Sequence, residues 1–172
     1  MFAAATSWLE KSAADIDALN VFPVPDGDTG TNMLLTMRSS LEEAERVPDR
    51  NAVAVAEAMA KGALMGARGN SGVILSQIWR GLATALAGKE TFDGSDLAGA
   101  LILASDRAYS GLSNPVEGTI LTVIKEAAAA AQTQADGDSN DVISIMEAAV
   151  NAASEAVANT PNLLKVLRDA GV

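Results

Sequence analysis

Alanine is the commonest residue of this chain, and it constrains the fold more than any other feature of the sequence. It has the highest intrinsic helix propensity, and its small side chain lets two helices approach closely. Of the 172 residues, 49% are hydrophobic but only 3% are aromatic, so the core must consist of small and aliphatic side chains. A chain of this length can bury such a core in one domain. The sequence therefore predicts an all-α fold of tightly packed helices.

Apolar residues recur at helical spacing in eight segments, and no segment shows the alternating pattern of a strand. Short connections favour antiparallel neighbours, and hence an eight-helix antiparallel barrel or bundle with its glycine-rich turns at one end. The seventh helix is expected to be capped by Ser139 or Asn140 and to end before Thr160, because Pro161 follows. The expected helices cover about residues 2–18, 30–46, 51–65, 71–87, 95–109, 119–131, 140–159 and 162–171.

Charge and composition exclude several classes of function. The formal net charge is −10, and twelve Lys and Arg residues do not supply the basic face that a nucleic-acid-binding protein needs. A nucleotide stays compatible with this charge, because bound Mg²⁺ and backbone dipoles can carry its phosphates. The chain has no cysteine and no histidine, which excludes disulfides, thiolate chemistry, a histidine base and histidine-ligated zinc. No apolar run is long enough for a membrane span and no signal peptide is recognised, so a cytoplasmic location is expected.

The segment that follows the first predicted helix carries the strongest chemical signal. Two prolines keep its backbone extended, and Asp26 and Asp28 then present two carboxylates separated by one glycine. Carboxylates are preferred ligands of Mg²⁺, which proteins usually share with substrate phosphates, and Asn20 is a third candidate ligand. The N–H groups of the next helix start, Thr29, Gly30, Thr31 and Asn32, suit the phosphates themselves. The alternative is an ordinary Asp-Gly turn in which an Asp or Thr caps the helix.

A second glycine-rich turn spans Gly66 to Gly72. Its glycines would let the backbone approach a phosphate, with the N–H groups of Gly69, Asn70 and Ser71 as donors. Arg68 lies between small residues, where it could meet a transferring phosphoryl group. The turn is not a Walker A loop, because no Lys-Ser or Lys-Thr follows at the required spacing. Taken alone, it is better explained by a C-cap glycine, a turn and an Asn or Ser N-cap.

A third turn, from Pro115 to Thr119, opens the sixth predicted helix. Glu117 and Thr119 could reach a ribose, an adenine edge or a metal-bound water from this helix start. The alternative is a turn initiated by proline, with Glu117 placed favourably against the helix dipole.

In their order and detail, the three turns closely resemble those of the amino-terminal nucleotide domain of bacterial fatty-acid kinases. That domain belongs to the superfamily of the dihydroxyacetone-kinase L subunit, and the resemblance covers essentially the whole chain. The matching segments are NVFPVPDGDTGTNM from Asn20, GARGNSGVILSQ from Gly66 and PVEGTILT from Pro115.

The resemblance implies an eight-helix barrel with two Mg²⁺ ions and ATP at one end. It implies that Asp26 and Asp28 carry the metal ions and that Asn70 and Ser71 hold phosphates. Gly118, Thr119 and Ile120 would lie near the adenosine. In this family the γ-phosphoryl group goes to the carboxylate of a fatty acid, which a separate lipid-binding protein presents. The product is an acyl phosphate.

The sequence departs from the dihydroxyacetone kinases at two positions. Those enzymes have His where this chain has Thr29, and a third Asp where only Asn20 or Val21 is available. Both differences favour the fatty-acid branch. Fatty-acid kinases are several times longer, so residues 1–172 are expected to form the single ATP-binding domain of a longer kinase, for which a homodimer is a further expectation. The alternatives are a dihydroxyacetone-type kinase subunit and an all-α adaptor whose turns are merely caps.

Overall fold

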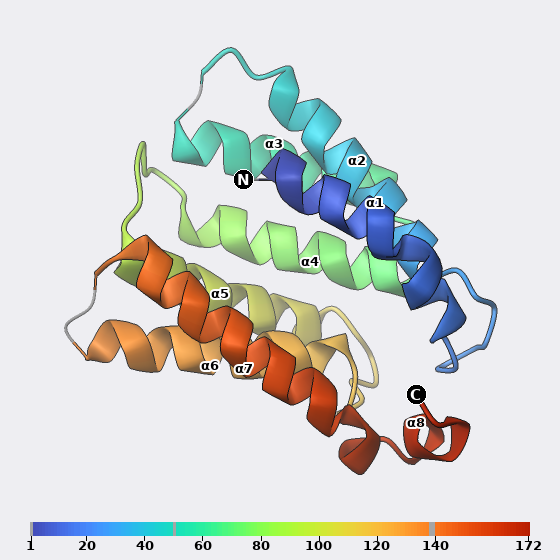
Figure 1. Cartoon of the computed structure of the whole chain (residues 1–172). Coiled ribbons are helices and arrows are strands. Elements are labelled where there is room, and N and C mark those ends of the chain that lie inside the picture. Colours follow the sequence, from blue (N-terminus) through green and yellow to red (C-terminus); the bar gives the residue numbers. More distant parts are fainter. Residues whose placement is uncertain (1, 50, 138–139) are drawn as a thin grey trace.

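The computed structural model describes residues 2–49, 51–137 and 140–172, and every regular element in these ranges is an α-helix (Figure 1). This confirms the all-α fold with eight helices that the sequence predicts. The helices are α1 (Phe2–Ala18), α2 (Thr29–Glu45), α3 (Ala52–Gly66), α4 (Gly69–Ala85), α5 (Gly94–Ser110), α6 (Ile120–Asp136), α7 (Val142–Leu163) and α8 (Lys165–Ala170). None of the helices in the described ranges is long and apolar enough to span a membrane.

Each helix packs against the next one along the chain, as expected for an antiparallel bundle with short connections. Helix α2 also contacts α4, and α5 also contacts α7, so the helices are arranged in layers. Helix α4 lies between the group formed by α1, α2 and α3 and the group formed by α5, α6 and α7 (Figure 1). Over the described residues, α1 contacts neither α7 nor α8, so the first and last helices of the bundle do not meet.

The core is divided among three clusters of buried side chains. The first lies between α2, α3 and α4, where the indole N–H of Trp79 points to the sulfur of Met37 at 3.3 Å and Phe2 packs edge-on against the Trp79 ring. The second joins α5, α6 and α7 and consists of Ile145 with four alanines. A third cluster, of Ala56, Ala83, Leu86 and Ala100, connects the two halves through α3, α4 and α5.

Glycines allow the closest approaches between helices. A β-carbon added at Gly81 in α4 would lie 2.4 Å from the Cα atom of Ala104 in α5. A β-carbon at Gly62 in α3 would lie 2.4 Å from the carbonyl oxygen of Ser39 in α2. Real β-carbons do not come this close to backbone atoms, so both helix pairs depend on the absence of a side chain at these positions.

The end of α7 differs from the sequence prediction. The helix does not stop before Thr160 but continues through Pro161 to Leu163, and α8 is correspondingly shorter than expected. Proline has no N–H to donate to the carbonyl of Val157, four residues earlier. The hydroxyl of Thr160 donates to that same carbonyl oxygen at 2.8 Å instead. The acceptor is therefore satisfied, and the helix tolerates the proline.

The start of α7 also differs. Asp141 caps the helix by accepting a hydrogen bond from the N–H of Ser144 at 2.9 Å, whereas Ser139, one of the two expected caps, lies outside the described residues. Asn140, the other expected cap, is used elsewhere. Its side-chain oxygen accepts from the N–H of Ser95 at 2.8 Å and its amide nitrogen donates to Asp93 at 2.9 Å, which ties the start of α7 to the start of α5.

Candidate functional site

The three turns singled out from the sequence lie at the same end of the bundle, because α1, α3 and α5 all run toward it (Figure 1). The first two are in direct contact. The Ser71 hydroxyl at the start of α4 donates to the carbonyl oxygen of Thr29 at the start of α2, at 3.3 Å. A β-carbon at Gly69 would lie 2.4 Å from the amide nitrogen of Asn32. The structure thus joins the starts of α2 and α4 into one surface.

Asn20 shapes the loop between α1 and α2. Its amide nitrogen donates to the carbonyl oxygen of Val24 at 3.1 Å, and its side-chain oxygen accepts from the N–H of Asp28 at 3.2 Å. These bonds close the loop on itself around the two prolines. The side-chain oxygen that sequence analysis assigns to a metal ion is therefore already engaged within the loop, and a role for Asn20 as a ligand stays a prediction.

Asp26 and Asp28 have carboxylates without a hydrogen-bond or ion-pair partner among the described residues. Asp26 is exposed and Asp28 is half-buried. Asp28 occupies the N-cap position of α2, yet its side chain makes no capping bond. The alternative explanation, in which the side chain of Asp28 caps α2, is therefore not what the structure shows. Two unengaged carboxylates on one bent loop fit the donor set of Mg²⁺, which takes one or two carboxylates and completes its shell with water and phosphate.

No group of three or more acidic side chains in the described ranges is arranged to hold a metal ion. A magnesium ion held by these two carboxylates would therefore take its remaining ligands from water, from the substrate or from an uncharged oxygen such as that predicted for Asn20.

The residue that caps α2 is Asp17, which sequence analysis missed. Its Oδ1 accepts hydrogen bonds from the N–H groups of Gly30 at 2.6 Å and Thr31 at 3.0 Å, and its Oδ2 accepts from the hydroxyl of Thr31 at 2.7 Å. The hydrogen bond from the Thr31 hydroxyl, together with the two from the backbone, lowers the pKa of Asp17 below its usual value. The N–H of Asn32 donates to the carbonyl oxygen of Asp28 at 2.8 Å. Three of the four donors assigned to phosphate at this helix start are thus already bonded within the protein.

The start of α4 has the opposite character. Its N-cap position is held by Arg68, which makes no capping bond, and the first backbone bond of the helix is from the N–H of Gly72 to the carbonyl of Arg68 at 2.9 Å. Within the described ranges, the N–H groups of Gly69, Asn70 and Ser71 have no hydrogen-bond acceptor. By contrast, α2, α3, α5, α6 and α7 all begin with a side-chain acceptor, supplied by Asp17, Asn51, Asp93, Thr119 and Asp141.

These free donors stand at the positive end of a 17-residue helix. The guanidinium of Arg68 is exposed beside them and donates only to the neighbouring carbonyl of Ala67, at 2.9 Å. The start of α4 is thus the part of this surface that suits an anion.

The loop before α6 is held by Glu117. Its carboxylate accepts from the hydroxyls of Tyr109 and Thr122 and pairs with Lys125 at 2.9 Å, and the hydrogen bond from Thr122 is the main cause that lowers the pKa of Glu117. Thr122 in turn accepts from the N–H of Gly118 at 2.8 Å. Glu117, a candidate for contact with a ribose or a metal-bound water, therefore serves in the structure to fix the backbone of its own loop.

Gly118 needs to be a glycine in this loop. It is buried with φ at +79°, and a β-carbon there would lie 2.6 Å from the β-carbon of Leu164, at the junction of α7 and α8. Thr119 follows as the cap of α6, accepting from the N–H of Leu121 at 3.3 Å and donating to the carbonyl of Val116 at 2.7 Å. Ile120 is the first, half-buried residue of α6.

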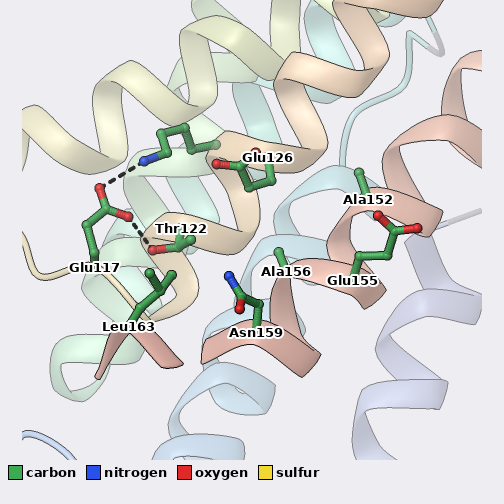
Figure 2. Close-up of a pocket in the computed structure, with 9 residues that line it drawn as sticks. Glu117, Thr122, Glu126, Ala152, Glu155, Ala156, Asn159 and Leu163 are labelled. Atoms are coloured by element: carbon green, nitrogen blue, oxygen red, sulfur yellow. Dashed lines mark hydrogen bonds and ion pairs between the residues drawn. The ribbon is translucent and has the colours of Figure 1, made fainter. Parts of the chain in front are cut away.

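A groove of about 650 Å³ runs between α6 and α7 beside this loop (Figure 2). Figure 2 shows Glu117, Thr122 and Leu163 at one end of it, with Glu126 and Glu155 farther along. Three carboxylates and one ammonium group, that of Lys125, line the groove, and none of its lining residues comes from the first two loops. The net negative charge of this lining disfavours phosphate, in contrast to the free N–H groups at the start of α4.

Comparison with known proteins identifies relatives of the chain. A family model described as "DAK2 domain" matches residues 23–172. The chain is 46% identical over 172 residues to the protein YloV of Bacillus subtilis (strain 168), an alignment that covers 100% of this chain and 31% of YloV. It is 47% identical over 164 residues to an uncharacterized protein of Staphylococcus epidermidis, covering 95% of this chain and 30% of that protein. An uncharacterized protein of Staphylococcus aureus (strain USA300) is 48% identical over the same length and coverage. The chain thus spans less than a third of the length of these relatives.

Proposed function

This chain belongs to the DAK2 domain family, and on that premise we propose that it is the Mg-ATP-binding domain of a kinase. The observation that carries the proposal is the contact between two complementary helix starts. One is preceded by a loop with two unengaged carboxylates, Asp26 and Asp28, and the other presents free N–H groups beside Arg68. A metal-bound triphosphate combines the two kinds of charge that such a surface recognises.

Each residue of the surface has a distinct part in the proposal. Asp26 and Asp28 hold magnesium ions, which neutralise the charge of the phosphates when bound. The N–H groups of Asn70 and Ser71 bind phosphate oxygens, and Arg68 stabilises charge on the transferring phosphoryl group. The loop with Gly118, Thr119 and Ile120 stands at the same end of the bundle and lies toward the adenosine.

For the acceptor we propose the carboxylate of a fatty acid, presented by a separate lipid-binding protein. A carboxylate oxygen attacks the γ-phosphorus, the bond from that phosphorus to the bridging oxygen of ADP breaks, and an acyl phosphate is formed. The attacking group is already ionised at neutral pH, so the step requires no general base. This agrees with a chain that has no histidine. Because the relatives are about three times longer, the proposal assigns acceptor binding to their other domains and to the partner, and any homodimer to the longer protein.

Calorimetric titration of the chain with ATP, in the presence and absence of Mg²⁺, tests the nucleotide site. Asp26→Ala is expected to abolish the Mg²⁺-dependent part of ATP binding and to leave the far-UV helicity unchanged, because its carboxylate supports no contact of the fold. Asp106→Ala, which removes an exposed carboxylate from α5, is the matched control. Normal Mg²⁺-dependent affinity in the Asp26 variant would contradict the assignment.

Two further measurements separate the proposal from its alternatives. If Mg²⁺ and ATP together do not raise the melting temperature beyond either alone, the adaptor alternative is favoured. With the full-length protein, phosphoryl transfer to dihydroxyacetone rather than to a protein-bound fatty acid would identify a dihydroxyacetone-type kinase.

A further inference from the structure

Asp17 is part of α1, but the helix that it caps is α2. The N–H groups that it binds, those of Gly30 and Thr31, are the second and third of α2, which the side chain at the N-cap ordinarily satisfies. The N-cap residue, Asp28, makes no such bond. We propose that Asp17 is a positioning residue of the metal-binding loop, which caps α2 from the neighbouring helix and so leaves the carboxylate of Asp28 available to a divalent cation.

The location of Asp17 in its own helix supports this role. It lies in the last turn of α1, where the helix dipole disfavours a carboxylate and where no basic residue offsets it. The start of α2 has the opposite polarity and supplies three donors to the same side chain. An acidic residue at this position is therefore explained by the helix that it caps and not by the helix that contains it.

The backbone holds Asp17 at this distance from α2. A β-carbon added at Gly30 would lie 2.2 Å from the carbonyl oxygen of Ala13, so α1 and α2 touch at the turn that Asp17 spans. Asn20 then fixes the intervening loop through the N–H of Asp28. The N–H of Asp28 and the start of α2 each have an acceptor, while the carboxylates of Asp26 and Asp28 have no partner among the described residues.

The inference rests on the proposed Mg-ATP site, and three substitutions test it. In Asp17→Ala the side chain of Asp28 is expected to take over the cap, so that binding a cation must first break that bond. Calorimetry with ATP and Mg²⁺ should then show an affinity about fivefold to tenfold weaker than that of the unchanged protein. Asp17→Asn keeps an oxygen that accepts from both N–H groups and should restore the affinity to within about twofold, because Asn caps as well as Asp. Asp15→Ala, which removes an exposed carboxylate from the same helix, is the control.

Two results would overturn the inference. One is an unchanged affinity in Asp17→Ala. The other is an equal loss in Asp17→Asn and Asp17→Ala, because the charge of Asp17 would then act on the cation directly. In a background of Asp28→Ala, the inference requires that Asp17→Ala cause no further loss of Mg²⁺-dependence, since its effect passes through Asp28.

A measurement without nucleotide separates this inference from the proposed function. The amide resonances of Gly30 and Thr31 should shift as Asp17 is protonated at acidic pH and should show no such titration in Asp17→Asn. If the chain binds no ATP but the amides behave in this way, the proposed function fails and the capping relationship stands. If the amides of Asp17→Asn titrate as in the unchanged protein, the capping relationship is wrong whatever the nucleotide result.

Discussion

The backbone of Gly69 lies against the side-chain amide of Asn32, close enough that a β-carbon at Gly69 would stand 2.4 Å from the amide nitrogen. Asn32 is in the first turn of α2 and Gly69 is the first residue of α4. This contact sets the spacing between the loop with two carboxylates and the helix start with free N–H groups. Substitutions at Gly69 therefore bear on stability and on the proposed site together.

Gly69→Ala is expected to lower the free energy of unfolding by more than the cost of placing alanine in the left-handed backbone conformation alone. Gly69 has φ at +57°, which costs an L-residue about 1–2 kcal/mol, and the added methyl group must also displace the buried Asn32 amide. Gly88→Ala is the matched control, because Gly88 has φ at +77° with open space around its β-position. Urea denaturation should show a larger loss for Gly69→Ala. Equal losses would mean that the Asn32 contact has no energetic weight.

Replacing two helical glycines by alanine should change the free energy of unfolding in opposite directions. Gly99→Ala in α5 meets no atom within 4 Å and is expected to raise the free energy of unfolding by about 0.5–1 kcal/mol, because alanine is the better helix former. Gly81→Ala in α4 places a methyl group 2.4 Å from the Cα atom of Ala104 and should destabilise by about 1–3 kcal/mol through overpacking. Thermal unfolding followed by circular dichroism measures both. A stabilising Gly81→Ala would show that α4 and α5 can move apart at little cost.

Asp93 should make stability depend on pH in the acid range. Hydrogen bonds from the N–H of Asp96 above all, and from Asn140 and Ser95, lower its pKa from 3.8 to about 2. Because the pKa is lower in the folded state, the stabilisation is fully present above the unfolded value of 3.8 and is lost as pH falls toward about 2.

Urea midpoints measured between neutral pH and pH 2 check this expectation. Asp93→Asn should remove part of the decline between pH 4 and pH 2, whereas Asp106→Asn, at an exposed position in α5, should leave the decline as it is. Parallel pH profiles for the unchanged protein and Asp93→Asn would contradict the role of the Asp93 hydrogen bonds.

The fold could be predicted because it depends on composition and local signals. Helix α5 illustrates this: Ala98, Ala100, Ala104 and Ala108 are all fully buried in it, as expected for a core of small side chains. The rule that a helix stops before proline was wrong at the end of α7. It takes no account of the Thr160 hydroxyl, which donates to the carbonyl oxygen of Val157. Helix propensity is a property of single residues, whereas the hydrogen bond that compensates for the proline depends on two residues, Thr160 and Val157.

The gathering of the three turns at one end of the bundle could be predicted as well, because short connections make neighbouring helices antiparallel. Which donors in those turns stay free could not. Gly30 and Ser71 look alike as N–H groups at helix starts, but the first is bonded to Asp17, 13 positions earlier in the chain, and the second is not bonded. That difference depends on how α1 crosses α2. An acidic residue in the last turn of α1 is the signal that could have indicated it.

The contact of Gly118 with Leu164 has a practical consequence for protein engineering. Positions 118 and 164 are far apart in the chain, yet the third loop rests on Leu164, the residue that immediately precedes the short helix after α7. Anyone who trims the polypeptide at about residue 163, on the view that a six-residue helix is a dispensable tail, would remove the support of a glycine turn next to the proposed adenosine. A loss of ligand affinity after such trimming would report a collapsed loop, although no binding residue had been deleted.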